Sequence, residues 1–409
     1  MCTCLRWLGM ATLGVVVTAI PRGAAAGEVT IVVSDPDGAA ARVGAPVEIE
    51  TPTEGGRLQG PVDPFSCHVE LVELGQTEPS RALPVPAQDV WGTWRFLMPP
   101  GPPGNRKFLL RVSPGKPLPV MNVPWGPDDE AIVTEGKAQV LRYKHRRTAP
   151  PSGIDPKYAR EDYIHPLYGP NGEVLTDDFP KDHPHHRGVW WSWPVTRWKN
   201  EVRDIWAVDG VWSRVEKLAL SNDAPILAEI AAQNVWKWSD KEPVVQEVVL
   251  IRAFKQGPCG RFIDIQIRLT ALEDGVAIGG RPKGGYGGFA LRAAPAKEQL
   301  IVRHTDPPDA KPRRCWLDYS GRFSGGKDIA GVAILEHPSN PRYPNELQEY
   351  PSINCVMSAF PGDREVPLPK DKTLTLKYRL WVHPGRADEK ALGDVWSAYA
   401  NPPKATLTK

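Results

Sequence analysis

The chain has 409 residues, of which 44 are proline, and its formal net charge is +2. A near-neutral chain without a basic run lacks the surface that binds nucleic acid or anionic lipid, so the expected partner is neutral or only weakly charged. Carbohydrate or another small neutral substrate fits this description, although neutrality alone does not select it. Proline at about twice its usual level of about 5% interrupts helices and central strands, which predicts short strands joined by many loops.

Residues 1–26 have the layout of a secretory signal peptide. Arg6 precedes an apolar run, and alanines at 24–26 provide a cleavage site. The run is short for a membrane span, and no later segment approaches the roughly 20 apolar residues of a spanning helix. We therefore expect an exported chain, periplasmic or secreted, without membrane insertion. Cleavage would remove Arg6 and Arg22 and no acid, which takes the formal charge from +2 to zero.

Four cysteines remain in the mature chain: Cys67, Cys259, Cys315 and Cys355. They are far apart and form no CxxC pair, so the spacing of a metal cluster is absent. In an oxidising compartment they could form one or two disulfides, or they could stay as buried thiols.

Residues 27–115 are predicted to form a small β-sandwich. Strand-length apolar or alternating pieces occur at 28–33, 45–50, 67–74, 93–98 and 107–112, with glycine- and proline-rich turns between them. Residues 114–130 carry five prolines and show no periodicity. The segment 116–130 is therefore predicted to be a linker.

Residues 131–409 are predicted to form a large antiparallel β-sandwich. Within 261–271 the odd positions from 263 onward are apolar and most even positions are polar, which is typical of a strand with one buried face. Only 388–400 has helical spacing, and we expect its apolar stripe to pack. The predicted fold class is all-β, with a small sandwich followed by a large one.

The stretch TDDFPKDHPHHRGVWWSW, residues 176–193, gathers three histidines among aspartates and tryptophans. In an extended segment His183 and His185 would project to one face and His186 to the other. Carboxylates can fix the tautomer of such imidazoles, which then act as general acid and base near neutral pH. His165 of the preceding hairpin could join them, and Arg187 would suit an anionic intermediate or a sugar hydroxyl.

Two alternatives for the histidines stay open. His183 and His185, with Asp178 as a third ligand, could hold a divalent metal ion, although no cofactor is indicated with certainty. A structural network of satisfied polar groups would need no ligand. Glu247, a carboxylate in the apolar segment VVQEVVL, is the candidate base, because such a group needs a partner or a raised pKa.

Eight of the fifteen tryptophans fall within the 49 residues 190–238. Indole rings stack on sugars and also fill cores, and Trp190 and Trp193 beside the histidines are the predicted sugar contacts. The glycine-rich loop RPKGGYGGFALR, residues 281–292, lacks the context of a phosphate loop. Its side chains could instead line a cleft. The further predicted substrate-binding residues are Tyr163, Arg281, Lys283 and Tyr286.

The segments YIHPLYGPNGEVLTDDFPKDHPHHRGVWWSW, GGYGGFALR, WLDYSG, ILEHPSNPRYP and YRLWVHPG resemble a bacterial family of exported proteins, over about residues 135–400. Its members are often labelled methane oxygenase. A membrane methane monooxygenase subunit needs several spanning helices, and the sequence has none after its signal, so that label is not carried over.

The resemblance implies a sandwich similar to the galactose mutarotase-like fold. Relatives of that fold epimerise, cleave or bind sugars, commonly with a histidine as acid and a carboxylate as base. It thus implies that His183, His185 or His186 supplies the acid. The leading hypothesis is an exported carbohydrate-active enzyme, an epimerase, lyase or hydrolase. The alternatives are a histidine-ligated metal protein and a non-catalytic sugar-binding protein.

Overall fold

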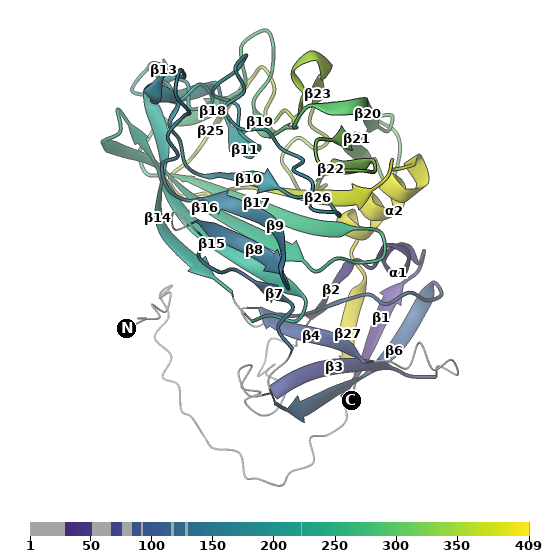
Figure 1. Ribbon diagram of the computed structural model, residues 1–409. Helices are drawn as coiled ribbons and strands as arrows, with labels where there is room; N and C mark the ends of the chain where they lie inside the picture. The colour runs from purple at the N-terminus through teal and green to yellow at the C-terminus, as the bar shows by residue number, and fades with distance from the viewer. Residues whose placement is uncertain are drawn as a thin grey trace.

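The computed structural model of the chain shows two β units packed together (Figure 1). It describes residues 29–50, 67–75, 84–90, 93–115, 118–126, 130–221 and 223–408, so the predicted signal peptide lies outside the described residues. Strands dominate these ranges, where the α-helices are α1 (Ala39–Val43) and α2 (Glu389–Ala400). The all-β prediction is confirmed. In the same ranges, no helix has the length and apolar character needed to cross a membrane.

The N-terminal unit, predicted from the sequence to be a small β-sandwich, has its strands joined into a closed barrel. Its described strands, in spatial order, are β1 (Val29–Asp35), β27 (Lys404–Thr408), β2 (Pro46–Glu50), β5 (Thr93–Leu97), β4 (Val85–Val90), β3 (Cys67–Glu73) and β6 (Gly104–Pro114). Alternate side chains point into the barrel, and Ile31, Phe96 and Phe108 are fully buried there. Strand β4 was not predicted, because proline, glutamine and aspartate interrupt its apolar pattern.

The barrel is completed by β27, which follows the whole large unit in the chain. This strand pairs antiparallel with β1 and parallel with β2. The predicted boundary of the large domain at residue 409 therefore differs from the structure, in which 404–408 belong to the barrel. Helix α2 leads into β27, and its Trp396 packs in the same apolar cluster as Ile31 of the barrel and Trp381 of the large unit. The two units thus share one hydrophobic cluster.

The large unit contains two eight-stranded antiparallel sheets and a small third sheet. Sheet 1 has the order β23 (Leu347–Tyr350), β24 (Cys355–Ser358), β19 (Gly288–Arg292), β11 (Val189–Ser192), β10 (Tyr163–Leu167), β9 (Ala138–Lys144), β8 (Ala131–Glu135) and β7 (Met121–Asn122). Sheet 2 has the order β14 (Val211–Leu220), β15 (Leu227–Trp238), β16 (Glu242–Phe254), β17 (Arg261–Ala271), β26 (Leu374–Pro384), β22 (Ala330–Glu336), β21 (Cys315–Phe323) and β20 (Ala296–Thr305). Sheet 3 joins β13 (Glu201–Arg203), β12 (Val195–Trp198), β18 (Ala277–Gly279) and β25 (Glu365–Pro367).

Part of the predicted linker is built into the sandwich. Strand β7 pairs with β8 at the edge of sheet 1, and Met121 is fully buried. The apolar residues Met121 and Val123 pack into the main core even though prolines surround them. The proline content therefore predicted a linker where part of the segment forms a paired strand with buried side chains.

One apolar cluster fills the space between sheets 1 and 2. Ile263, Ile265 and Ile267 of β17 lie in it, which confirms the predicted alternation. Side chains of this size each contribute about 1.5–3 kcal/mol when they are removed from water. The predicted helix is α2, and the Asp388 side chain caps it by accepting a hydrogen bond from the Ala391 amide at 2.7 Å. Cys259, Cys315 and Cys355 are free thiols.

The closing strand offers a direct test of the barrel. Ala405 of β27 is fully buried, whereas the next residue, Thr406, is exposed. We expect Ala405→Asp to lower the free energy of unfolding by at least about 2 kcal/mol, because a carboxyl group would enter an apolar interior. Thr406→Asp is the matched control and should stay within about 0.5 kcal/mol of the wild type. Urea unfolding measures both variants, and equal stabilities would contradict the placement of β27.

Candidate functional site

The alternation of side chains along β11 divides the tryptophan-rich segment between two environments. Val189 and Trp191 point between the two large sheets and belong to the main core. Trp190 points to the outer face of sheet 1, where it packs with Tyr163 and Trp206. The loop that carries the histidines precedes β11 and lies over this outer face, since His186 contacts Trp190 at 5.2 Å between ring centroids.

The loop turns at Pro184, so the histidine segment is not extended. The His186 amide donates to the His183 carbonyl at 2.8 Å, which closes the turn. Gly188 allows the loop to enter the sheet, because a Cβ atom there would lie 2.2 Å from the carbonyl oxygen of Ile164. The turn brings all three imidazoles to one side, instead of the two sides expected for a strand.

The three rings form one aromatic cluster. His183 stacks on His186 at 4.7 Å between centroids, and His185 meets His186 edge-on at 4.7 Å. Trp206 supports the cluster from below with a contact to His186 at 5.5 Å. Tyr286 in turn contacts Trp206 at 5.6 Å and is half-buried at the margin. The fold therefore gathers the DHPHHRG histidines into one group, which we call the histidine cluster (His183, His185 and His186).

A chain of charged groups runs through the exposed margin of the histidine cluster. Arg292 at the end of β19 donates to both carboxylate oxygens of Asp182, at 2.8 and 3.1 Å. The second partner of Asp182 is the Nδ1 atom of His183, at 3.0 Å. Partial burial alone would raise the pKa of Asp182, but hydrogen bonds from His183 and Arg292 lower it to about 2. An ionised carboxylate only accepts, so Nδ1 of His183 carries the proton and Nε2 is left as an acceptor.

The two inner imidazoles are held neutral. Burial lowers the pKa of His186 to about 2, helped by the neighbouring histidines and Arg292. Burial and the charge of His183 lower the pKa of His185 to about 4. His183 keeps 39% of its side-chain surface accessible, while His185 is half-buried and His186 is buried. In the histidine cluster, His183 is thus accessible, and its two neighbours His185 and His186 are neutral.

Arg187 braces the loop and does not face a ligand, contrary to its predicted catalytic role. Its side chain is fully buried, and its guanidinium donates to the carbonyls of Pro184 and His186 at 2.6 and 2.9 Å and also to that of Tyr158. It lies 3.5 Å from the ring centroid of Phe179. The buried guanidinium joins two carbonyls of the histidine loop to that of Tyr158, and it thereby fixes the loop.

Tyr163 and Asp178 belong to the same brace. The Tyr163 hydroxyl donates to Asp178 at 3.1 Å, and Asp178 lies 3.5 Å from Nε of Arg187. Burial raises the pKa of Asp178 to about 6 in spite of the guanidinium. Tyr163 is fully buried and cannot contact a substrate as predicted. Among the described residues, no three His, Cys, Asp or Glu side chains are arranged to hold a metal ion, so the predicted set His183, His185 and Asp178 is not brought together.

Glu247 lies on the opposite side of sheet 1 from the histidine cluster, which contradicts its predicted role as the base. It is fully buried between the large sheets. Its carboxylate accepts hydrogen bonds from Trp191 at 2.9 Å, Asn234 at 2.8 Å and Trp236 at 2.7 Å. Asp162 also bonds to Glu247, and burial followed by the Glu247 charge raises the pKa of Asp162 far above its usual range. The result is a closed structural network.

Trp190 and Trp193 are both inaccessible, so neither can stack on a sugar as predicted. Trp190 is covered by His186 and Trp206. Trp193 is in the main core, where its ring contacts Trp236 and its Nε1 donates to the Phe360 carbonyl at 2.9 Å. The tryptophans that are concentrated in residues 190–238 therefore mainly pack against the two faces of sheet 1.

The remaining predicted residues divide between two places. His165 lies apart from the ring contacts of the histidine cluster, bonds to Thr176 at 2.9 Å, and has its pKa lowered to about 3 by burial and nearby cations. Arg281 and Lys283 are exposed on the glycine-rich loop, and Tyr286 follows them beside Trp206. Of the predicted site, the structure thus unites the histidine cluster and Tyr286.

Arg292 and Trp206 were missed as members of the site. In GFALR the apolar Phe289 and Leu291 face the main core, so Ala290 and Arg292 face the outer side. An arginine at the end of such a strand was a usable signal. The signal for Trp206 was only its place among eight tryptophans, which does not separate it from core residues.

A model of a family of unknown function, DUF6807, matches residues 131–397, which is more than half of the chain. The chain belongs to this family. The DUF6807 region includes sheets 2 and 3, every strand of sheet 1 except β7, and the whole histidine cluster, and it excludes the barrel strands at both ends. No curated protein matches the sequence.

Glu247 can be tested as a structural residue of the DUF6807 region. We expect Glu247→Gln to lower the free energy of unfolding by about 1–3 kcal/mol, because an amide group would oppose N–H donors that now meet a carboxylate. Glu216→Gln on β14 is the matched control, since Glu216 is exposed and its ion pair with Lys237 contributes about 0–1 kcal/mol. Denaturant unfolding measures both, and an unaffected Glu247→Gln would refute the network.

The neutral imidazoles predict acid sensitivity. The unfolded chain binds protons at its histidines near pH 6.5, while folded His186 and His185 resist protonation to about pH 2 and pH 4. Stability should therefore fall as the pH drops from about 6.5 to 4, by at most about 1.4 kcal/mol per pH unit for each such histidine. Urea midpoints measured against pH should fall less steeply for His186→Gln. Pro184→Ala, which alters the loop without removing an imidazole, should keep the wild-type slope; the same slope in His186→Gln would disprove the assignment.

Proposed function

We propose that the chain is an exported carbohydrate-active enzyme that works by general acid–base catalysis, with His183 as the proton-transfer residue. The observation that carries the proposal is the chain of contacts from Arg292 through Asp182 to His183. A carboxylate bonded to Nδ1 fixes the tautomer of an imidazole and stabilises the imidazolium that forms when Nε2 takes a proton. His183 has this carboxylate partner, and 39% of its side-chain surface is also accessible.

Each charged group in the chain has a separate role. Asp182 accepts from His183 and positions its ring, while Arg292, whose side chain is only 5% exposed, holds Asp182 in place. His185 and His186 stay neutral, so a proton on His183 has no second cation among the imidazoles beside it. The reaction that fits is removal of a proton from a substrate hydroxyl or from an acidic carbon, and its later return.

A neutral sugar is the substrate class that the surroundings favour. The half-exposed ring of Tyr286 lies at the margin of the cluster, and Tyr158 lies 6.2 Å from His185 between centroids. Tyrosine rings provide an apolar face and a polar tip for a sugar. Arg281 and Lys283 on the neighbouring exposed loop could meet hydroxyl groups. The two large antiparallel sheets are compatible with the resemblance to galactose mutarotase-like proteins, which is an analogy of fold and leaves the reaction open.

The proposal can be tested with a panel of neutral mono- and oligosaccharides in D₂O. Proton NMR detects exchange of a C–H proton in an epimerase or lyase and new reducing ends in a hydrolase. We expect wild-type protein to convert at least one sugar and His183→Gln to lose at least about 100-fold in rate, the usual contribution of a positioned acid or base. Asp182→Asn should lower kcat and shift the pH profile, because the imidazolium loses its partner.

His68→Gln is the matched control, since His68 is a half-exposed histidine of the barrel. It should keep full activity. Unchanged turnover in His183→Gln would remove His183 from the mechanism. Sugar binding without any product would favour the non-catalytic alternative.

A further inference from the structure

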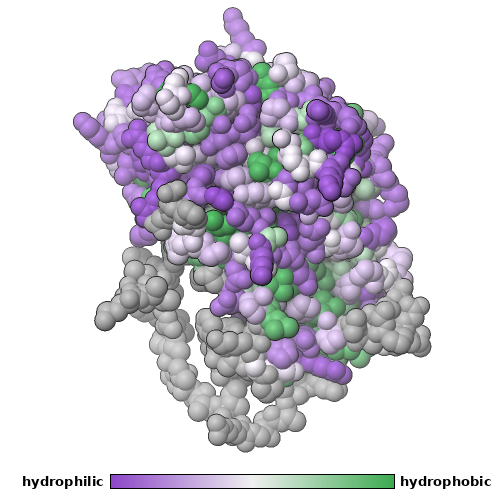
Figure 2. All heavy atoms as spheres, in the orientation of Figure 1, coloured by the Kyte–Doolittle hydropathy of each residue, from purple (hydrophilic) through white to green (hydrophobic). Residues whose placement is uncertain are grey.

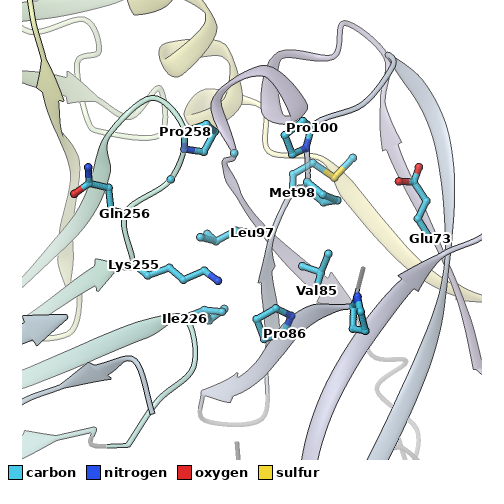
Figure 3. A pocket seen from close by; sticks show the side chains of 14 residues that line it. Glu73, Val85, Pro86, Leu97, Met98, Pro100, Ile226, Lys255, Gln256 and Pro258 are labelled. Carbon is cyan, nitrogen blue, oxygen red and sulfur yellow. The ribbon is translucent and has the colours of Figure 1, made fainter. Parts of the chain in front are cut away.

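A cavity of about 530 Å³ lies between the barrel and the sandwich, at a different place from the histidine cluster (Figure 3). The barrel contributes residues of β4 and β5, including Val85 and Leu97. The sandwich contributes Ile226 and the turn 255–258 between β16 and β17. Figure 2 shows apolar side chains at the surface where the two units meet. Cavities of this volume at domain junctions are common sites for small ligands.

The lining is apolar except for a few groups, and most of these have partners within the protein. Five prolines, together with aliphatic side chains, form the walls. Glu73 is locked in a bidentate ion pair with Arg106, at 2.7 and 2.6 Å. In Figure 3 Glu73 lies on the opposite side of the cavity from Lys255. No acidic group is therefore available inside the cavity among its described lining residues.

Lys255 is the exception. Its side chain extends from the sandwich into the cavity between Leu97 and Ile226 (Figure 3). Within the described ranges no carboxylate lies within 4.0 Å of its ammonium group. Glu135 is the acid whose charge favours the protonated form of Lys255, but its carboxylate is already paired with Arg261 at 2.5 Å. Partial burial lowers the pKa of Lys255. A cation held against apolar walls is destabilised unless an anion joins it.

We propose that this cavity binds an apolar carboxylate, a medium-chain fatty acid or an aromatic acid, with Lys255 as its anchor. The ammonium group pairs with the ligand carboxylate, and the prolines and aliphatic residues enclose its hydrocarbon part. Since both units supply the walls, the bound ligand would hold the barrel against the sandwich. The site is independent of the proposed sugar chemistry, and its test does not use that activity.

Titration calorimetry of the full-length chain with decanoate and with 1-naphthoate tests the proposal. We expect saturable one-to-one binding of at least one of them and a ligand-dependent rise in the melting temperature. Lys255→Met keeps the aliphatic stem without the charge and should weaken binding by at least about tenfold, as expected for loss of a charge-assisted hydrogen bond. Decanol has no carboxylate, so its binding should be the same in wild type and Lys255→Met.

Two further variants keep the test decisive. Lys297→Met removes an exposed lysine of β20 and should leave binding unchanged. Val85→Phe fills the cavity from the barrel side and should weaken decanoate and decanol alike. The proposal is overturned if neither acid binds with defined stoichiometry, or if Lys255→Met, shown by circular dichroism to be folded, binds the acid as tightly as wild type.

Discussion

The pairing of Arg292 with Asp182 is the contact on which the histidine cluster depends. It joins a loop to the end of β19, a strand more than a hundred residues later in the sequence. The arginine is almost fully covered, while the aspartate is partly open to solvent. A bidentate pair of this kind fixes direction as well as distance. Because Asp182 is anchored, the ring of His183 has a defined orientation on an otherwise exposed turn.

Two polar systems lie on opposite faces of sheet 1, and strand β11 separates them. The outer system is the histidine cluster over Trp190, and the inner one is the network of Glu247, Asp162 and Trp191. Buried carboxyl groups are tolerated inside only because every oxygen has a donor or shares a proton. The inner network therefore fixes one tryptophan of β11, and the histidine cluster covers its neighbour. This arrangement gives a rigid base to a loop that has little regular structure of its own.

Local patterns were predictable from the sequence, and distant partnerships were not. The alternation in β17 and the apolar stripe of α2 can be recognised from residues that are close in sequence. The three histidines meet for the same reason, because only a few residues separate them. Glu247 was placed wrongly, because VVQEVVL is apolar on both sides and its pattern does not tell which face lies between sheets. The prediction that Trp190 and Trp193 contact a sugar was wrong for a related reason, since composition does not distinguish a buried indole from an exposed one. Arg292 needed knowledge of strand pairing, which a single sequence does not contain.

The barrel has a consequence for the order in which the protein can be completed. Without β27, its strands form an open sheet with β1 at one edge and β2 at the other, and both edges have unpaired backbone groups. The missing strand follows the entire sandwich and α2 in the chain. During synthesis the edges of the N-terminal sheet therefore stay unpaired, and able to pair with other chains, until the sandwich and α2 have been made. The first unit in the sequence is in this sense the last that can close.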